Sequence, residues 1–273
     1  MTRAPGAPAR DELRAHLVAS GIAGAVATPR ENNLNNYLDL SRGAVQHLFG
    51  IRPRGAWPMP DVLALMAKRC GVSPDPSHTE GQDTIDPDLT INGLDAMADR
   101  LRQAARRRER VVVATGHPVG LRPTHTAVAR GLRMAGCTLL RPAAGWLHPY
   151  DGAFRKQHGN RVRYVDDVGV AAAPDGELRH THSPMYMQAA LAALGSAGEP
   201  PPDLVVADHG WAGAAGQAGI DAVGFADCND PALFVGEAEG LVLVCVPLDD
   251  NLAPQLYEPL TRYLLERAAI NDK

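Results

Sequence analysis

Short apolar runs alternate with amphipathic segments over the second half of the chain. The runs lie at residues 111–114, 137–140, 204–207, 222–226 and 241–246. Such runs are typical of strands buried on both faces of a sheet. After the first run, Thr124 opens a segment with Val128 and Leu132 on one face, and Gly136 closes it before the second run. Strand, helix and strand in this order make a parallel βαβ unit, so the pattern predicts an α/β fold with a mainly parallel three-layer sheet.

The first part of the chain predicts helices and no strand. Apolar positions recur there at helical spacing, with glycine or a basic run after the last of them. The helices are expected at residues 11–21 or 11–24, 60–70 and 88–108. We therefore expect an N-terminal helical region at 1–108 and an α/β domain at 109–273, which together form one compact unit.

The region between residues 142 and 182 is less regular. Residues 142–161 form a long insertion without periodicity, and loops of that length often carry function. Residues 162–170 and 178–182 flank Pro174-Asp175-Gly176, which is a turn signal for a hairpin. A closing helix over residues 254–269 follows the last predicted strand.

Polar side chains follow the predicted strands where each strand ends. They are Thr115-Gly116-His117, His180-Thr181-His182, Asp208-His209-Gly210, residues 227–230 and residues 249–251. Because the carboxyl ends of parallel strands meet at one edge of a sheet, these side chains are expected to converge. Asp is also a good helix N-cap, so Asp208 and Asp227 either cap the next helices or belong to a site. Two such strand ends in succession, with glycine every third residue from Gly210 to Gly219 between them, favour a site.

Two groups of these polar residues have the chemistry of ligands. His180 and His182 point the same way from an extended chain, as metal or phosphate ligands could. Residues 28–37 contain Arg30 and four asparagines, including Asn32 and Asn33. A guanidinium and amides suit a phosphate or carboxylate, although the same stretch also reads as a polar helix cap and loop.

The remaining strand-end residues suit metal and proton chemistry. Asp208 and Asp227 could hold a divalent cation, while His117 or His209 exchanges a proton. These residues have no diagnostic spacing. The hypothesis rests on their convergence at one sheet edge.

Composition limits the class of partner. The chain has 273 residues, 45% of them hydrophobic and 21% charged, with a formal charge of −4. This is the composition of a globular protein, and it argues against a general nucleic-acid or membrane-surface partner but leaves a local basic site open. The scattered Cys70, Cys137, Cys228 and Cys245 form no C-x-x-C pair and fit a reducing cytoplasm. The sequence leaves open whether the chain forms a homo-oligomer.

Several familiar catalytic signatures are absent from the sequence. There is no phosphate-binding G-x-x-x-x-G-K-[ST], no G-x-G-x-x-G, no G-x-S-x-G elbow and no H-E-x-x-H. No cysteine has an arginine six residues later, and Asp166-Asp167-Val168-Gly169 does not match the D-x-D-x-[TV] motif of haloacid-dehalogenase-type enzymes.

The combination of motifs resembles a known family over nearly the whole chain. The motifs are Ala27-Thr28-Pro29-Arg30-Glu31-Asn32-Asn33, Gln82-Asp83-Thr84-Ile85-Asp86-Pro87, Ala114-Thr115-Gly116-His117-Pro118, His180-Thr181-His182-Ser183, Val206-Ala207-Asp208-His209-Gly210-Trp211-Ala212-Gly213 and Phe225-Ala226-Asp227-Cys228-Asn229-Asp230-Pro231. Together they are similar to a family of actinobacterial proteins of this length that are labelled "phosphatase". The resemblance implies hydrolysis of a phosphomonoester of a small metabolite.

With that function, the strand-end residues take specific expected roles. The catalytic candidates are His117, Asp208 and His209. The metal candidates are Asp208, Asp227 and Asn229, which would hold a divalent ion such as Mg²⁺ or Mn²⁺ that activates water. The substrate-binding candidates are Arg30, Asn32, Asn33, Thr115, Gly116, His180, His182 and Asp230. Among these, the Thr115 and Gly116 backbone amides at a helix start are expected to hold the phosphate.

Two other functions stay open at this stage. Thr115-Gly116-His117-Pro118, with the later Gly219-Ile220, resembles the arrangement in D-glutamate cyclase-type lyases, which implies action on a small carboxylate. A small-molecule-binding module without chemistry would use the same strand ends but needs no pair of groups for proton transfer.

Overall fold

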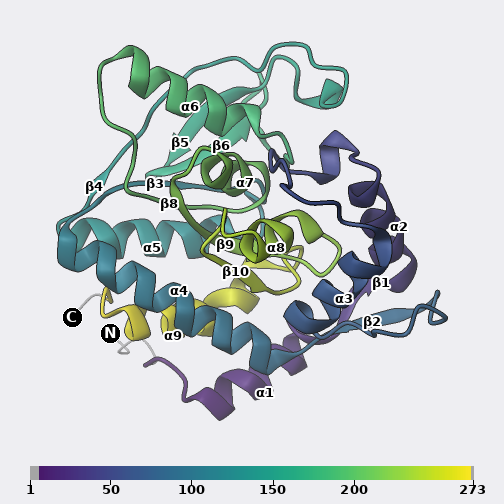
Figure 1. The fold of residues 1–273 in the computed structure, drawn as a ribbon. Coiled ribbons are helices and arrows are strands. Elements are labelled where there is room, and N and C mark those ends of the chain that lie inside the picture. Colours follow the sequence, from purple (N-terminus) through teal and green to yellow (C-terminus); the bar gives the residue numbers. More distant parts are fainter. Residues whose placement is uncertain (1–5, 272–273) are drawn as a thin grey trace.

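The apolar runs form a central sheet that is mainly parallel, as the computed structural model shows for residues 6–271 (Figure 1). The sheet runs in the order β10-β9-β8-β3-β6-β5, with β4 beside β3 and β7 beside β6. The parallel strands are β3 (Arg110–Ala114), β4 (Thr138–Leu139), β6 (Val168–Ala172), β8 (Leu204–Val206), β9 (Asp221–Ala226) and β10 (Val244–Pro247). Both β5 (Arg161–Val165) and β7 (Leu178–Arg179) pair with β6 in the antiparallel sense.

The strand register aligns the carboxyl ends of the central strands. Val113 of β3 lies opposite Val206 of β8, which in turn lies opposite Val223 of β9. β9 and β10 continue the alignment up to the pair formed by Ala226 and Pro247. The loops that leave these strands therefore emerge side by side at one edge of the sheet.

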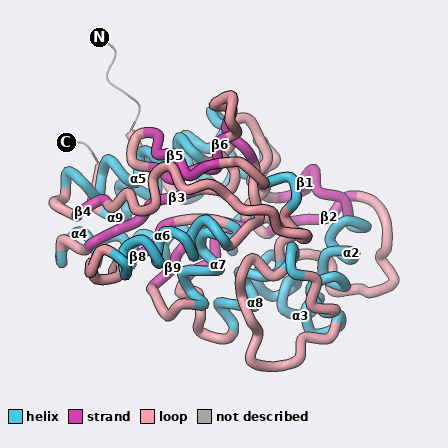
Figure 2. Tube along the Cα trace, turned by 90° about the horizontal axis from the view of Figure 1, so that it is seen from above, coloured by secondary structure: helices cyan, strands magenta, loops and turns pink. Residues whose placement is uncertain are grey.

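Helices cover both faces of the sheet, which gives the expected three layers (Figures 1 and 2). One layer contains α4 (Pro87–Arg107), α5 (Arg122–Met134) and α9 (Glu258–Ala268), with α1 (Arg10–Ser20) packed on α4 and α9. The other layer contains α7 (His209–Gln217) and α8 (Pro231–Ala238), with α6 (Met185–Ser196) against α7. Outside α8 lie α2 (Arg30–Ser41) and α3 (Met59–Cys70). Short 3₁₀ turns are η1 (Val45–His47), η2 (Arg155–Gln157) and η3 (Pro254–Tyr257).

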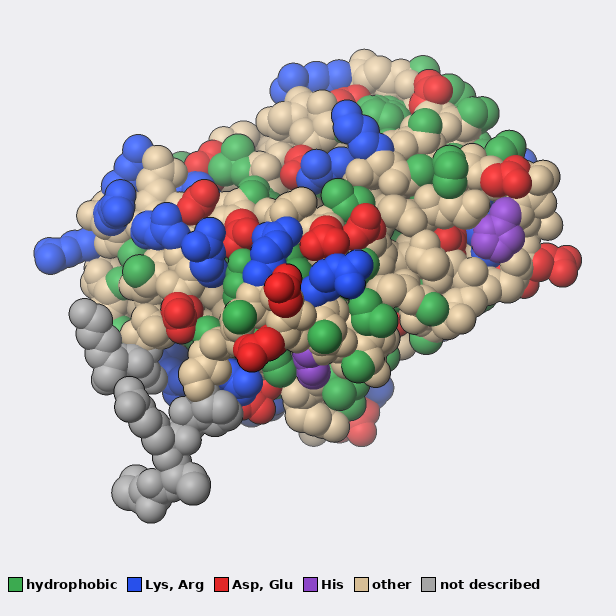
Figure 3. All heavy atoms as spheres, turned by 90° about the horizontal axis from the view of Figure 1, so that it is seen from below, with side chains coloured by type: hydrophobic (Ala, Val, Ile, Leu, Met, Phe, Trp, Pro, Cys, Tyr) green, Lys and Arg blue, Asp and Glu red, His purple; other side chains and the backbone are tan. Residues whose placement is uncertain are grey.

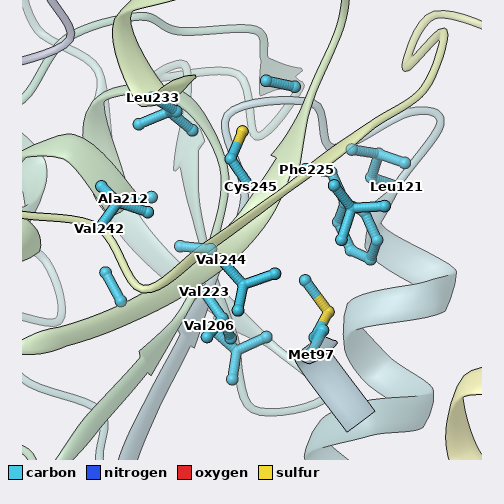
Figure 4. Close-up of a cluster of buried hydrophobic side chains, with 14 of the residues drawn as sticks. Met97, Leu121, Val206, Ala212, Val223, Phe225, Leu233, Val242, Val244 and Cys245 are labelled. Carbon is cyan, nitrogen blue, oxygen red and sulfur yellow. The ribbon is translucent and has the colours of Figure 1, made fainter. Parts of the chain in front are cut away.

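A continuous hydrophobic core joins the N-terminal helices to the sheet. Figure 4 shows part of it, where Met97 of α4 lies beside Val244 of β10 and Leu121 lies beside Phe225 of β9. The same cluster of buried side chains extends into α1 and the segment after it. Residues 6–108 and 109–271 therefore share one core.

Glycines on one face of α7 allow unusually close packing. A Cβ atom at Gly210 would lie 2.4 Å from the carbonyl oxygen of His182, and one at Gly213 would lie 2.1 Å from that of Phe49. Residues three apart share a helix face, so the glycine period seen in the sequence is a packing surface. This surface brings Phe49 and His182 next to the start of α7.

The structure departs from the sequence predictions at two strand regions. The N-terminal region contains a two-stranded antiparallel sheet, β1 (Gly24–Pro29) with β2 (Gln82–Ile85), where no strand was expected. Both strands are short, polar or rich in small residues, so they lack the β-branched signal of a buried strand. Residues 162–170 are not one strand, because a turn with positive φ at Asp166 (49°) and Asp167 (68°) separates β5 from β6. The hairpin at Pro174–Gly176 is confirmed by the antiparallel pairing of β6 and β7.

The outer face of α1, α4 and α9 carries charged side chains of both signs (Figure 3). Arg10 of α1 and Arg267 of α9 both pair with Asp95 of α4, at 3.1 and 2.9 Å. Exposed pairs of this kind contribute little stability each. Within residues 6–271, no helix has the length and apolar character that a membrane crossing requires.

Candidate active site

The polar strand ends converge at one edge of the sheet, as the sequence predicted. The loop after β3 supplies His117, the segment after β7 supplies His180 and His182, and the start of α7 supplies His209. The loops after β9 and β10 add Asp227, Asp230, Asp249 and Asp250.

Four imidazole rings pack against one another at the centre of this edge. The ring centroids of His117 and His180 lie 4.2 Å apart, and those of His117 and His209 lie 4.5 Å apart. His182 stacks on His209 at 4.8 Å, and Phe49 contacts both of these rings. Four histidines in mutual contact offer several ring nitrogens to one small volume.

His209 is the most constrained member of this histidine cluster. It is a non-glycine residue with φ of +47°, a conformation that persists only where the surroundings hold it. Its Nδ1 lies 2.8 Å from Oδ1 of Asp208, and its Nε2 lies 3.1 Å from Oδ2 of Asp230. Burial alone would lower the pKa of His209, but the hydrogen bonds to the two carboxylates outweigh burial and raise its pKa well above the ordinary value.

Asp208 orients this histidine and does not cap the helix. It is the N-cap residue of α7, yet its side chain accepts no capping hydrogen bond from a backbone amide of that helix. Instead, its carboxylate accepts hydrogen bonds from the Thr115 hydroxyl at 2.5 Å and from the Gly116 amide at 2.6 Å. Burial would raise the pKa of Asp208, but the hydrogen bond from His209 and the nearby histidines lower it. Asp208 is therefore a buried anion that is hydrogen-bonded to Nδ1 of His209.

The other three histidines are electrically neutral. Burial, together with the charge of His209, lowers the pKa of His117, His180 and His182 to about 3. A neutral imidazole is the form that binds a metal ion.

Several carboxylates from the loops after β9 and β10 lie close together next to the histidine cluster. Burial and neighbouring Asp249 raise the pKa of Asp227 to about 7. Burial and the surrounding carboxylates also raise the pKa of Asp250 well above its usual range, although His209 acts in the opposite direction. Oδ2 of Asp250 is buried without a hydrogen-bond partner and lies 3.3 Å from Nδ1 of His117. Buried carboxylates that crowd one another in this way fit a site that receives a cation.

Two overlapping groups of side chains have the geometry of metal ligands. Within residues 6–271, the ligand atoms of His117, His180 and His209 lie within 4.8 Å of one another, and so do those of His182, His209 and Asp230. His209 belongs to both groups. The donor set, imidazole nitrogens with one carboxylate, fits a divalent transition metal.

The cluster forms the wall of a pocket of about 400 Å³. His117, His180 and His182 line it together with Asp227, Asp230 and Asp250. The amide side chains on its rim are Asn32, Asn36, Asn229 and Asn251. No lysine or arginine of the described residues lines this pocket.

Arg30 and Asn33, expected to bind substrate, lie away from this pocket. The Arg30 side chain is fully buried, and its guanidinium donates to Asp83 Oδ2 at 2.8 Å and to the carbonyl oxygen of His78. Asn33 donates to the same carboxylate oxygen at 2.9 Å. Both side chains join α2 to β2.

The Thr115 and Gly116 amides are also occupied. The Thr115 amide donates to the Gly169 carbonyl, the Gly116 amide donates to Asp208, and α5 begins only at Arg122. The expected phosphate-binding helix start at Thr115 and Gly116 is therefore not present.

The two groups of possible metal ligands in the structure differ from the metal ligands expected from the sequence. Asp227 and Asn229 line the pocket, whereas Asp208 lies behind His209. Sequence reasoning did not single out Asp250 or Phe49. Asp250 carried a signal as part of a polar strand end, while nothing in the sequence marked Phe49.

Comparison with known proteins identifies the family of the chain. A family model described as "Phosphatase" matches residues 8–272. The chain is also 50% identical over 268 residues to Phosphatase SCO2771 of Streptomyces coelicolor, an alignment that covers 97% of this chain and 98% of that protein. These matches confirm the resemblance to phosphatase-labelled proteins and support a phosphatase role. Since the family match runs through every loop that contributes to the histidine cluster, the chain belongs to the Phosphatase family.

Proposed function

We propose that this protein hydrolyses a phosphomonoester of a small metabolite and that the histidine cluster holds at least one divalent metal ion for the reaction. The observation that supports this most directly is the pair of ligand groups, of which His117, His180, His182 and Asp230 line the open pocket while His209 is buried next to them.

The charge of the pocket supports the need for a metal ion. A phosphomonoester carries close to two negative charges at neutral pH. The pocket presents Asp227, Asp230 and Asp250 but no lysine or arginine, and Arg30 is held by Asp83. The positive charge of His209 is already balanced by Asp208 and Asp230, so without an added cation the remaining carboxylates would repel the phosphate group. A bound metal ion reverses the sign of the local field.

The donor set favours a transition metal such as Zn²⁺ over Mg²⁺. Imidazole nitrogens suit Zn²⁺ and related ions, whereas Mg²⁺ prefers oxygen ligands and retained water. When bound, such an ion would supply Lewis acidity that activates a water nucleophile and offsets charge on the transferred phosphoryl group.

In this proposal the residues of the chain bind and orient. His117, His180, His182 and Asp230 hold the cation, and His209 joins them when the metal ion displaces the proton on Nε2 that faces Asp230. Asp208 fixes the ring of His209 through Nδ1, and such partners keep ligating histidines in one orientation. The side-chain amides of Asn32 and Asn251 are placed to donate hydrogen bonds to phosphate or leaving-group oxygens. Asn36 and Asn229 donate instead to the Asn229 carbonyl oxygen and to Asn32 Oδ1, which fixes the position of Asn32.

The test is hydrolysis of p-nitrophenyl phosphate and a panel of phosphorylated metabolites by metal-depleted protein to which Zn²⁺, Mn²⁺ or Mg²⁺ is returned. We expect activity that depends on added metal, with Zn²⁺ or Mn²⁺ above Mg²⁺. In the variant His180→Ala, bound metal measured by elemental analysis and activity should both fall, the latter by at least about 100-fold. The matched control His158→Ala removes an exposed histidine that does not line the pocket and should retain both. Full activity in metal-depleted protein, or in His180→Ala, would contradict the proposal.

A further inference from the structure

A second pocket opens directly beside the histidine cluster. It has a volume of about 430 Å³ and shares His180 and His182 with the first pocket. Its far side is formed by Gln46 and by residues 152–157 of the irregular insertion. A ligand bound at the cluster can therefore extend into this second pocket past the two shared histidines.

The insertion is fixed to the histidine segment by buried hydrogen bonds. Gln157 donates from Nε2 to the carbonyl oxygen of His180 at 2.9 Å, and its Oε1 accepts from the Tyr186 hydroxyl at 2.9 Å. The fully buried His148 lies 2.8 Å from the Ser183 hydroxyl through its Nε2. These contacts hold η2 at a set position relative to His180 and His182.

The charge of the second pocket is opposite to that of the first. Arg155 and Lys156 of η2 both line it and are exposed, and neither makes an ion pair or a side-chain hydrogen bond within the described part of the chain. No aspartate or glutamate of residues 6–271 lines this pocket. Two unpaired cations next to an acidic pocket form an attractive surface for an anionic group.

We propose that this second pocket binds a second anionic group of the substrate, so that the substrate carries a carboxylate or another phosphate in addition to the ester that is cleaved. This inference rests on the proposed function, because the cleaved phosphate would occupy the first pocket. Arg155 offers a planar donor set for two oxygens, and Lys156 offers a compact charge. The insertion thus selects among phosphomonoesters by what lies beyond the scissile bond.

Binding of non-hydrolysable phosphonates to the metal-loaded protein tests this inference. Isothermal titration calorimetry would compare n-alkylphosphonates with ω-carboxyalkylphosphonates and alkane bisphosphonates of the same chain lengths. For at least one length, the second anionic group should tighten binding by about 10-fold, the effect of charge-assisted hydrogen bonds at a solvated site. The carboxylate and bisphosphonate series show which of the two anions the pocket prefers.

The double variant Arg155→Ala/Lys156→Ala should abolish this preference for the second anion. The matched control Lys68→Ala/Arg106→Ala removes one exposed lysine and one exposed arginine outside both pockets and should keep it. The second-anion site is wrong, while the proposed function stands, if wild-type protein binds alkylphosphonates and hydrolyses p-nitrophenyl phosphate but shows no preference for a second anion. The second-anion site is also wrong if the double variant keeps that preference. If wild-type protein neither binds phosphonates nor hydrolyses p-nitrophenyl phosphate, the proposed function fails and this inference fails with it.

Discussion

The substitution Asp208→Asn separates an orienting role for Asp208 from a structural one. The carboxylate accepts hydrogen bonds from three groups, the Thr115 hydroxyl, the Gly116 amide and the His209 ring. An asparagine amide nitrogen can replace only one of the two oxygens. The Thr115 hydroxyl can rotate to accept from that nitrogen, so the best orientation keeps the oxygen toward Gly116 and His209.

The expected loss of stability is therefore small. One weakened hydrogen bond and the lost charge next to His209 correspond to about 1–3 kcal/mol in the metal-loaded protein. For a chain of this size, each kcal/mol lowers the melting temperature by about 2–4 °C, so Tm should fall by roughly 2–12 °C. The expected functional loss is larger, because the histidine keeps its place but loses the anion that orients it and increases its basicity. Metal affinity should fall about 10–100-fold, with activity at limiting metal falling in proportion.

Metal titration followed by activity, together with thermal unfolding, measures both effects. Asp167→Asn is the matched control, since Asp167 is also a buried aspartate but pairs with Arg133 and Arg141 and belongs neither to the pocket nor to the ligand groups. It should lose stability and keep its metal affinity. An unchanged metal affinity in Asp208→Asn would refute the orienting role, and a protein that no longer folds would show that Asp208 is a structural residue.

Three further predictions follow from the geometry. Treatment with EDTA should abolish hydrolysis and lower Tm, because a metal that binds only the folded state stabilises it, and return of Zn²⁺ should restore both; an unchanged Tm and rate would argue against the metal site. In metal-free protein, the pKa of Asp227 is about 7, against an ordinary value of 3.8, so folding favours the protonated side chain. The resulting contribution to stability is complete below pH 3.8 and is lost as the pH rises through 7. The Tm of Asp227→Asn should therefore lie above that of wild type at pH 8 and equal it near pH 4. Thermal unfolding at a series of pH values measures this. The same difference in Tm at both pH values would refute it. Gly213→Ala should destabilise the fold by about 1–3 kcal/mol, because the added Cβ atom meets the Phe49 carbonyl oxygen. Gly195→Ala, at a helical position with open space around it, should not destabilise the fold. Equal denaturation midpoints for the two variants would count against this packing.

The sheet and the convergence of its loops could be predicted from the sequence for a physical reason. Strands buried on both faces leave continuous apolar runs, and parallel strands must end at a common edge. His117, His180 and His209 could therefore be placed in one region although they are far apart in the chain.

The pairing of each polar residue could not be predicted in the same way. Arg30 looked available for phosphate, but Asp83, 53 residues later, takes its guanidinium. Asp208 looked like a helix cap or a metal ligand, but the Thr115 hydroxyl and the Gly116 amide take its oxygens. Such pairings depend on side-chain positions between elements, and periodicity contains no information on them.

The distribution of cations connects the two proposals. The first pocket holds buried carboxylates with raised pKa values, including Asp227 and Asp250, and no lysine or arginine of residues 6–271 lines it. The unpaired cations Arg155 and Lys156 lie in the neighbouring pocket instead. A phosphate group without further anions would gain attraction only from the bound metal and the neutral asparagine amides, so many phosphomonoesters would bind similarly there. Discrimination among substrates would then come from the second pocket, because only a substrate with an anion at the right distance gains from both sources of positive charge.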